Sequence, residues 1–201
     1  MNKTQYHNLA LFDFDGTITK KDSLLELIKF IHGWRILFWG LLKLSPYIIC
    51  YKIGLLQAKI AKEKLLAYFF KGMPVSDFQK KCDQFSTQLI PQMVKKEALL
   101  EITRLKREGF DIYIVTASIE NWVKPWSSSC HIACIATQIE VKNGIITGKI
   151  TGENCNGEEK VKRIKAQINL TDYTTIRTYG NSKGDSQMLQ IGTNSFYRKF
   201  S

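Results

Sequence analysis

Two carboxylates two residues apart, at the end of an apolar run, constrain the fold of this chain more than any other feature. Residues 9–12 are all apolar, as in a buried strand, and Asp13 and Asp15 follow them closely. Because side chains alternate between the faces of a strand, both carboxylates can project from its carboxyl end while Phe14 packs away from them, and Gly16 permits a tight turn. Ligands of open α/β sheets bind at the carboxyl ends of strands. The segment therefore predicts a functional site, and a strand followed by an ordinary polar turn is the alternative interpretation.

Three further segments follow in order along the chain. Thr116 ends a second apolar strand, Lys160 lies at the start of a helix, and a loop after a third apolar strand carries Asn181 and Asp185. Each of these features is common by itself, since Thr ends many strands and Lys opens many helices. Together with the paired carboxylates they form a specific series of four motifs.

The order of these motifs resembles that of the haloacid dehalogenase (HAD) superfamily of phosphatases, in particular its subfamily IB, the phosphoserine phosphatase-like branch. The resemblance covers most of the chain, and the first motif, Asp-x-Asp-x-Thr, is met by Asp13, Asp15 and Thr17. It implies an α/β fold with a Rossmann-like core, a parallel sheet and an inserted all-helical cap domain. The expected division is a catalytic core of residues 1–19 and 97–201 and a cap of residues 20–96.

The resemblance also implies a reaction, the Mg²⁺-dependent hydrolysis of a phosphomonoester through an aspartyl-phosphate intermediate. Asp13 would be the nucleophile, and Asp15 would protonate the leaving alcohol and later activate the attacking water. Thr116 and Lys160 would hold the phosphoryl oxygens and offset charge that develops in the transition state. The other residues expected to bind substrate are Thr17, Ala117, Ser118 and Asp22.

A cation is expected because a carboxylate and a phosphate repel each other by on the order of 4 kcal/mol at ~4 Å in a partly screened site. Mg²⁺ prefers oxygen ligands, which the resemblance assigns to Asp13, the backbone carbonyl of Asp15, Asn181 and Asp185. The family commonly has Asp where this chain has Asn181. Either Asn181 is a neutral ligand or Asp185 carries more of the metal binding. The intact Asp13 and Asp15 favour an active enzyme.

Apolar periodicity and Gly or Pro punctuation predict the order of the elements. Helices are expected from residue 23 to about residue 109, with amphipathic runs at 57–71 and 75–89. The α/β pattern should then resume, and Asn143-Gly144 indicates a β-hairpin. The later elements expected are strand 111–116, helix 119–129, a strand from 132, a helix after 157, strand 174–179, a helix near 185–191 and a short end at 196–200.

Most of the positive charge lies in the expected cap. Residues 20–96 contain 14 basic and 5 acidic residues, a net charge of +9 out of +11 for the chain, and residues 27–62 contain no acidic residue. Aromatic and aliphatic residues alternate with these bases, as in helices that lie on an anionic membrane surface. The alternative is a helical bundle with its apolar residues inside. A membrane span is not expected, because Lys43 and Pro46 interrupt an apolar run shorter than ~20 residues. Nucleic acid is not expected either.

The substrate is open between two classes. Asp22 lies nine positions after Asp13, where phosphoserine phosphatases read the substrate's ammonium group, but Asp22 is also well placed to cap a helix that begins at Ser23. A basic, apolar cap also suits a lipid phosphate, such as a phosphatidylglycerophosphate-like compound. The alternative function is that of a non-catalytic relative whose cap binds a membrane or a protein partner.

The composition agrees with a compact intracellular enzyme. The chain has 201 residues, of which 44% are hydrophobic, enough for a substantial core. Five scattered cysteines argue against a disulfide framework, and Cys130, His131 and Cys134 lack a second pair at zinc-site spacing. No apolar targeting run precedes the first strand. We therefore expect a cytoplasmic protein, either free or peripheral at the inner membrane surface.

Overall fold

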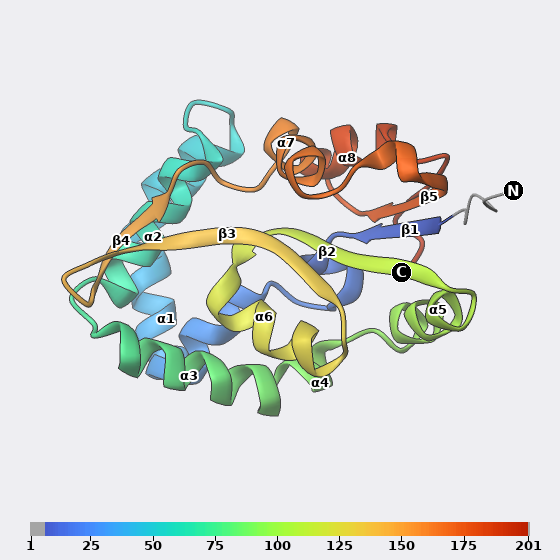
Figure 1. Cartoon of the computed structure of the whole chain (residues 1–201). Coiled ribbons are helices and arrows are strands. Elements are labelled where there is room, and N and C mark those ends of the chain that lie inside the picture. The colour runs from blue at the N-terminus through green and yellow to red at the C-terminus, as the bar shows by residue number, and fades with distance from the viewer. Residues whose placement is uncertain (1–6, 201) are drawn as a thin grey trace, which may run out of the picture.

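The computed structural model describes residues 7–200, and residues 1–6, on which the expected absence of a targeting run partly rests, lie outside the described part. The first half of this part is a strand followed by a helical insertion (Figure 1). Its elements are β1 (His7–Phe12), the irregular turn η1 (Phe14–Ile18), α1 (Ser23–Lys52), α2 (Ala58–Phe70), α3 (Val75–Gln88), α4 (Ile90–Met93) and α5 (Lys96–Arg107).

Strands and helices alternate in the second half, apart from the β3–β4 hairpin. Its elements are β2 (Phe110–Ile119), α6 (Glu120–Ser129), β3 (Ala133–Lys142), β4 (Ile145–Thr151), α7 (Glu158–Gln167), η2 (Leu170–Asp172), β5 (Tyr173–Gly180), η3 (Lys183–Asp185), α8 (Ser186–Gln190) and β6 (Asn194–Tyr197). The six strands form one sheet in the order β4-β3-β2-β1-β5-β6. Among the strand pairs of residues 7–200, only β3–β4 is antiparallel. The expected α/β fold with a parallel core sheet is therefore confirmed.

Strand β1 lies inside this sheet and is buried on both faces. Ala10 and Phe12 belong to the larger hydrophobic cluster, which includes α5 and α6 residues, whereas Leu9 and Leu11 belong to a second cluster with α7 and α8. Figure 1 shows α7 and α8 on one side of the sheet and α5 and α6 on the other. The continuous apolar run before Asp13 is thus that of a central strand covered by two layers of helices.

The Asn143-Gly144 turn connects β3 to β4 as expected. Both residues have positive φ angles, 50° for Asn143 and 76° for Gly144, which matches the twist of a two-residue hairpin. The two amphipathic runs also form helices, α2 and α3. Strand β2 extends further than expected because a register shift between Thr116 and Ile119 lets the strand continue past the predicted end.

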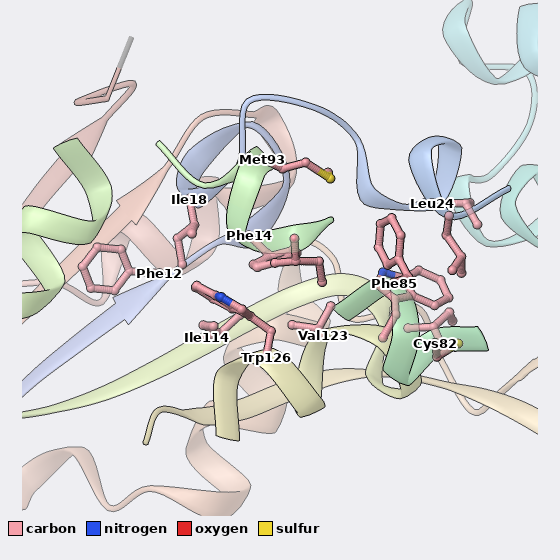
Figure 2. Close-up of a cluster of buried hydrophobic side chains, with 14 of the residues drawn as sticks. Phe12, Phe14, Ile18, Leu24, Cys82, Phe85, Met93, Ile114, Val123 and Trp126 are labelled. Atoms are coloured by element: carbon pink, nitrogen blue, oxygen red, sulfur yellow. The ribbon is translucent and has the colours of Figure 1, made fainter. Parts of the chain in front are cut away.

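All regular elements between η1 and β2 are helical, and they pack closely on the rest of the chain. Helix α1 is broken at Gly33, whose φ of 81° and ψ of 163° are not helical. A Cβ on Gly148 of β4 would collide with the backbone of Ala67, so α2 lies directly against the hairpin. Figure 2 shows Phe14 and Trp126 in the same cluster as Phe85 of α3. The insertion and the sheet therefore share one hydrophobic core, and the division at residues 19 and 97 stays a prediction.

Two further expectations concern membranes and cysteines. Within residues 7–200 there is no helix with the length and apolar character required to cross a bilayer. All five cysteines are free, as expected for a chain without a disulfide framework. The interpretation of the apolar residues in α1 as the interior of a bundle is wrong for one side of the helix, because Trp34 and Trp39 are each 63% exposed.

Candidate active site

The first motif lies at the carboxyl end of β1, where the pattern of apolar and acidic residues predicts it. The Asp13 amide donates to the carbonyl of Tyr179 at 2.9 Å, which ties the motif to the end of β5. Gly16 has a φ of 77°, and a Cβ there would collide with Nδ2 of Asn181. The turn therefore needs glycine for its conformation and for the close approach of the fourth motif.

Asp13 shares a buried ion-pair network with Lys160 and Asp185. Lys160 Nζ lies 2.7 Å from Asp13 Oδ1 and 2.6 Å from Asp185 Oδ1. Thr17 Oγ1 donates to the other oxygen of Asp13, Oδ2, at 3.2 Å. The three charged side chains are almost completely buried, so their mutual attraction is weakly screened by water. Residues of the first, third and fourth motifs thus meet at one point.

The charges in this network shift one another's pKa values. Burial raises the pKa of Asp13, and the nearby Asp185 adds to this rise, while Lys160 opposes it. Burial alone would lower the pKa of Lys160, but the two carboxylates outweigh burial and raise it. For Asp185, burial acts to raise the pKa, but Lys160 and Ser182 together lower it. Lys160 is therefore a firmly charged ammonium beside the expected nucleophile.

Asp185 is held on all sides by hydrogen-bond donors. Its Oδ2 accepts from the Asn181 amide at 3.1 Å, from the Ser182 amide at 2.9 Å and from Ser182 Oγ at 2.7 Å. Its Oδ1 accepts from Lys160. Both carboxylate oxygens of Asp185 are therefore hydrogen-bonded to neighbouring residues. Asp185 thus shapes the fourth-motif loop, and its expected role as a direct metal ligand stays a prediction.

Asp15 is held separately from Asp13, by residues of the second motif and of α1. Ser118 Oγ donates to Asp15 Oδ2, and the Ser23 amide donates to Oδ1 at 2.7 Å. Burial raises the pKa of Asp15 to about 7, and the charge of Asp22 contributes to this rise. Asp15 can therefore hold or release a proton near neutral pH, as a general acid and base must.

Two residues of this hydrogen-bond network were not expected from the sequence. Ser23 Oγ lies 3.0 Å from Ser118 Oγ and accepts from Trp122 Nε1 at 2.9 Å. Trp122 is fully buried. These contacts join residues 95 and 99 positions apart, and no local pattern in the sequence signals such pairs. Through Ser118, they position the carboxylate of Asp15.

The second motif places Thr116 and Ala117 at the end of the regular part of β2. Thr116 Oγ1 accepts from the Ser118 amide at 3.0 Å, so its own proton remains available to a phosphoryl oxygen. The carbonyl of Ala117 accepts from Lys62 Nζ at 2.6 Å. Of the three residues of this motif that are expected to contact substrate, Ser118 touches Asp15 directly, and Thr116 is joined to Ser118.

Lys62 on α2 is a third residue of the site that was not expected from the sequence. Its ammonium donates to Asn154 Oδ1 at 2.8 Å in addition to Ala117. Burial lowers the pKa of Lys62 to about 8, while Asp15 and Asp22 oppose this effect. No salt bridge holds this ammonium within residues 7–200, since both of its hydrogen-bond partners are neutral. Lys62 is thus a positive charge available to an anionic ligand.

A cavity of about 460 Å³ lies beside Lys62, between α1 and α2. Its lining includes Asp22, Ala117 and Asn154, so it adjoins the second motif. Most of its walls are apolar, formed by Leu24, Leu25, Leu41, Ile48 and Leu65. Such a cavity can hold a ligand with an apolar body and a charged end.

Asp22 itself caps a helix. Its Oδ1 accepts from the amide of Leu25 at 3.0 Å, the arrangement of an N-cap carboxylate at the start of α1. The capping role that the sequence offered as an alternative is therefore confirmed. Asp22 also lines the cavity. Its expected contact with the ammonium group of a substrate remains a prediction.

The oxygen donors near Asp13 fit a hard cation. Within the described residues, His, Cys, Asp and Glu side chains do not form a cluster of three with metal-binding geometry. A metal ion would therefore need amide or backbone carbonyl oxygens as well as carboxylates. The side chain of Asn181 lies against Gly16, next to Asp15, and supplies such an amide. The set of Asp13, Asp15 carbonyl and Asn181 oxygens contains only ligand types that Mg²⁺ prefers.

Comparison with known proteins adds independent information. The family model described as haloacid dehalogenase-like hydrolase matches residues 10–190. Protein CicA of Caulobacter vibrioides is 31% identical over 194 residues, which cover 96% of this chain and 86% of CicA.

Solved structures with low sequence identity share the fold. A protein with unknown function from Bordetella pertussis Tohama I has a TM-score of 0.81 and 22% identity, with 95% of this chain and 89% of that chain covered. A phosphoserine phosphohydrolase-like protein from Francisella tularensis subsp. tularensis SCHU S4 has a TM-score of 0.68 and 18% identity, with 93% and 84% covered. A phospho-aspartyl intermediate analogue of phosphoserine phosphatase has a TM-score of 0.63 and 20% identity, with 95% and 86% covered.

Proposed function

The chain belongs to the haloacid dehalogenase-like hydrolases, and from this premise we propose that it hydrolyses phosphomonoesters through an aspartyl-phosphate formed on Asp13. The observation that carries the proposal is the pairing of two carboxylates with different environments at the end of β1. Asp13 lies beside the charged Lys160, whereas Asp15 has a pKa of about 7 because of its burial. These two environments suit Asp13 for the role of nucleophile and Asp15 for the role of proton carrier.

In the first step, a carboxylate oxygen of Asp13 attacks phosphorus, and the bond from phosphorus to the ester oxygen breaks. Protonated Asp15 gives its proton to that oxygen, which leaves as an alcohol. Lys160 and the Thr116 hydroxyl donate to the phosphoryl oxygens and offset their charge. Ser118 and Ser23 hold Asp15 in position for this transfer.

In the second step, the carboxylate of Asp15 accepts a proton from water, and the water oxygen attacks phosphorus. The bond between phosphorus and Asp13 breaks, so inorganic phosphate leaves and both carboxylates return to their starting states. Asp13, the Asp15 carbonyl and Asn181 would hold Mg²⁺. When bound, this ion supplies positive charge that reduces the repulsion between nucleophile and phosphate.

The cavity next to Lys62 supports an amphiphilic substrate, such as a lipid phosphate, more than phosphoserine. Phosphoserine would make few apolar contacts with the cavity walls, because its body carries an ammonium and a carboxylate group. Asp22, the candidate reader of an ammonium group, is engaged as a helix cap. A ligand with an aliphatic body would instead remove water from Leu41, Ile48 and Leu65.

Phosphate release from para-nitrophenyl phosphate tests the proposed activity. We expect turnover with Mg²⁺, little turnover with a chelator, and none in Asp13→Asn. Asp77→Asn is the matched control, because Asp77 is exposed on α3. Absence of turnover in the wild-type protein with Mg²⁺ would favour the alternative, a non-catalytic relative in which Asn181 marks a lost metal site. A comparison of phosphoserine with a short-chain phosphatidic acid then tests the substrate class.

A further inference from the structure

Beyond Gly33, α1 continues to Lys52 with apolar residues around its whole circumference. A helix of this kind is normally buried on all sides. Here only one side is covered, where Gly40 and Leu44 are buried, and a Cβ on Gly40 would collide with Phe69 of α2. Figure 1 shows α1 and α2 next to β4, at the end of the sheet order.

The uncovered side carries a cluster of exposed apolar side chains. We define the α1 face as Trp34, Phe38, Trp39, Leu42 and Ile49 together with Ile53, the residue directly after the helix, each more than half exposed. Of the 17 large hydrophobic side chains exposed within residues 7–200, 10 lie between residues 34 and 55. Exposed apolar groups gathered in this way, rather than scattered singly, indicate an interaction surface.

Basic residues flank the α1 face. Arg35, Lys43 and Lys52 are exposed, and none of them takes part in a salt bridge of the described residues. Residues 27–62 contain no acidic residue that could neutralise them. The partner of this surface must therefore be both apolar and negatively charged.

We propose that the α1 face docks on an anionic lipid surface. Aromatic and aliphatic side chains would enter the boundary between headgroups and acyl chains, and the flanking bases would contact anionic headgroups. A second copy of the chain fits less well, because a symmetric contact would bring Arg35, Lys43 and Lys52 of each copy close together without any acidic residue from this segment.

The docking surface and the cavity are formed by neighbouring residues of α1. Leu41 and Ile48 line the cavity, and the next residues along the helix, Leu42 and Ile49, belong to the α1 face. Docking would therefore bring the cavity close to the lipid surface. This consequence rests on the proposed function, because it would let a phosphomonoester reach Asp13 from the membrane, whereas docking itself does not depend on catalysis.

Sedimentation with vesicles tests the proposal. We expect the full chain to bind vesicles of equal parts phosphatidylcholine and phosphatidylglycerol, to bind phosphatidylcholine vesicles much less, and to be partly released by salt. The double variant Leu42→Glu/Ile49→Glu should lower the partition coefficient roughly a hundredfold or more, since each residue loses its apolar burial. Its thermal stability and its turnover of para-nitrophenyl phosphate should stay unchanged. Leu100→Glu, at a site 60% exposed on α5, is the control and should bind normally.

A second pair of variants separates charge from apolar contact. Arg35→Gln/Lys43→Gln should weaken binding by roughly fivefold for each residue. Lys80→Gln/Lys81→Gln changes the net charge equally, but on exposed positions of α3, and should have little effect. Equal losses in both double variants would mean that binding depends on net charge alone, which would overturn the proposal.

Two other results would also overturn it. One is normal vesicle binding by Leu42→Glu/Ile49→Glu. The other is a wild-type dimer in light scattering that this double variant dissociates, because the face would then belong to a second copy. Asp13→Asn should bind vesicles like the wild type, so loss of the proposed activity and loss of docking are distinguishable.

Discussion

Lys160 and Asp13 are 147 positions apart in the chain, yet Lys160 Nζ lies 2.7 Å from Asp13 Oδ1 in the interior of the protein. The same ammonium contacts Asp185 at 2.6 Å, so one lysine compensates two buried carboxylates. Removing one partner from a buried ion pair leaves an uncompensated charge, which costs far more than the loss of a surface pair. The site is therefore also a determinant of stability.

Lys160→Met should lower the free energy of unfolding by about 3–5 kcal/mol and abolish turnover. Lys165→Met, on the exposed side of the same helix, should change stability by less than about 0.5 kcal/mol. Urea unfolding of both variants measures the difference. Equal stabilities would show that the buried network contributes nothing to folding.

Asn181→Asp should strengthen Mg²⁺ binding. The substitution adds one negative charge to a site whose proposed donors include Asp13 and the Asp15 carbonyl, and this is expected to raise affinity by about tenfold or more. Calorimetric titration with Mg²⁺ measures the effect, with Asn194→Asp on β6 as an exposed control. An unchanged or weaker affinity would place Asn181 outside the ligand set.

Lys62 should make stability depend on pH in the alkaline range. Its pKa is lowered by burial to about 8, against 10.5 for the ordinary side chain, so between these values the unfolded chain binds the proton and the folded protein does not. The free energy of unfolding should therefore rise with pH in this window, relative to a Lys62→Met variant.

The same group should also affect substrate binding. As the Lys62 ammonium loses its proton above its pKa of about 8, the KM for an anionic substrate should rise, and Lys62→Met should lack this rise. Lys64→Met is the control, because Lys64 is exposed on the same helix and does not line the cavity. Parallel profiles for wild type and Lys62→Met would exclude a role for this ammonium in binding.

The sequence predicts the parts of the site that depend on local pattern. An apolar run before Asp13 specifies a buried strand, and the position of Thr116 at the end of the regular part of β2 follows from the same rule. Asn143-Gly144 specifies its turn through backbone conformation alone. These features need only a few neighbouring residues, so they can be read without the fold.

Other parts depend on contacts between distant segments. Lys62 meets Ala117 across 55 positions, and Ser23 meets Trp122 across 99. Nothing in the helix containing Lys62 marks it apart from the other bases of the insertion. The sequence also does not predict which side of α1 is exposed, because a helix that is apolar all round does not indicate which side is covered.

Gly148→Ala tests whether the insertion is fixed to the sheet by α2. Gly148 has a φ of 83°, and a Cβ there would collide with the backbone of Ala67, so the substitution should cost about 1–3 kcal/mol for the clash in addition to backbone strain. Gly152→Ala is the matched control, because its φ is 67° and a Cβ would meet nothing within 4 Å. Equal losses of stability in the two variants would mean that α2 moves away freely.

The central claim is that Asp13 becomes phosphorylated, and trapping the phosphoenzyme in an Asp15→Asn variant tests it most directly. Nitrophenolate is a weakly basic leaving group that needs no proton, so the variant should still transfer the phosphoryl group to Asp13 but hydrolyse it slowly. After an acid quench of the variant incubated with para-nitrophenyl phosphate and Mg²⁺, mass spectrometry should find a phosphoryl group on the peptide that contains Asp13. The double variant Asp13→Asn/Asp15→Asn should carry none. A phosphoryl group on another residue, or wild-type turnover without any phosphoenzyme in Asp15→Asn, would contradict the account.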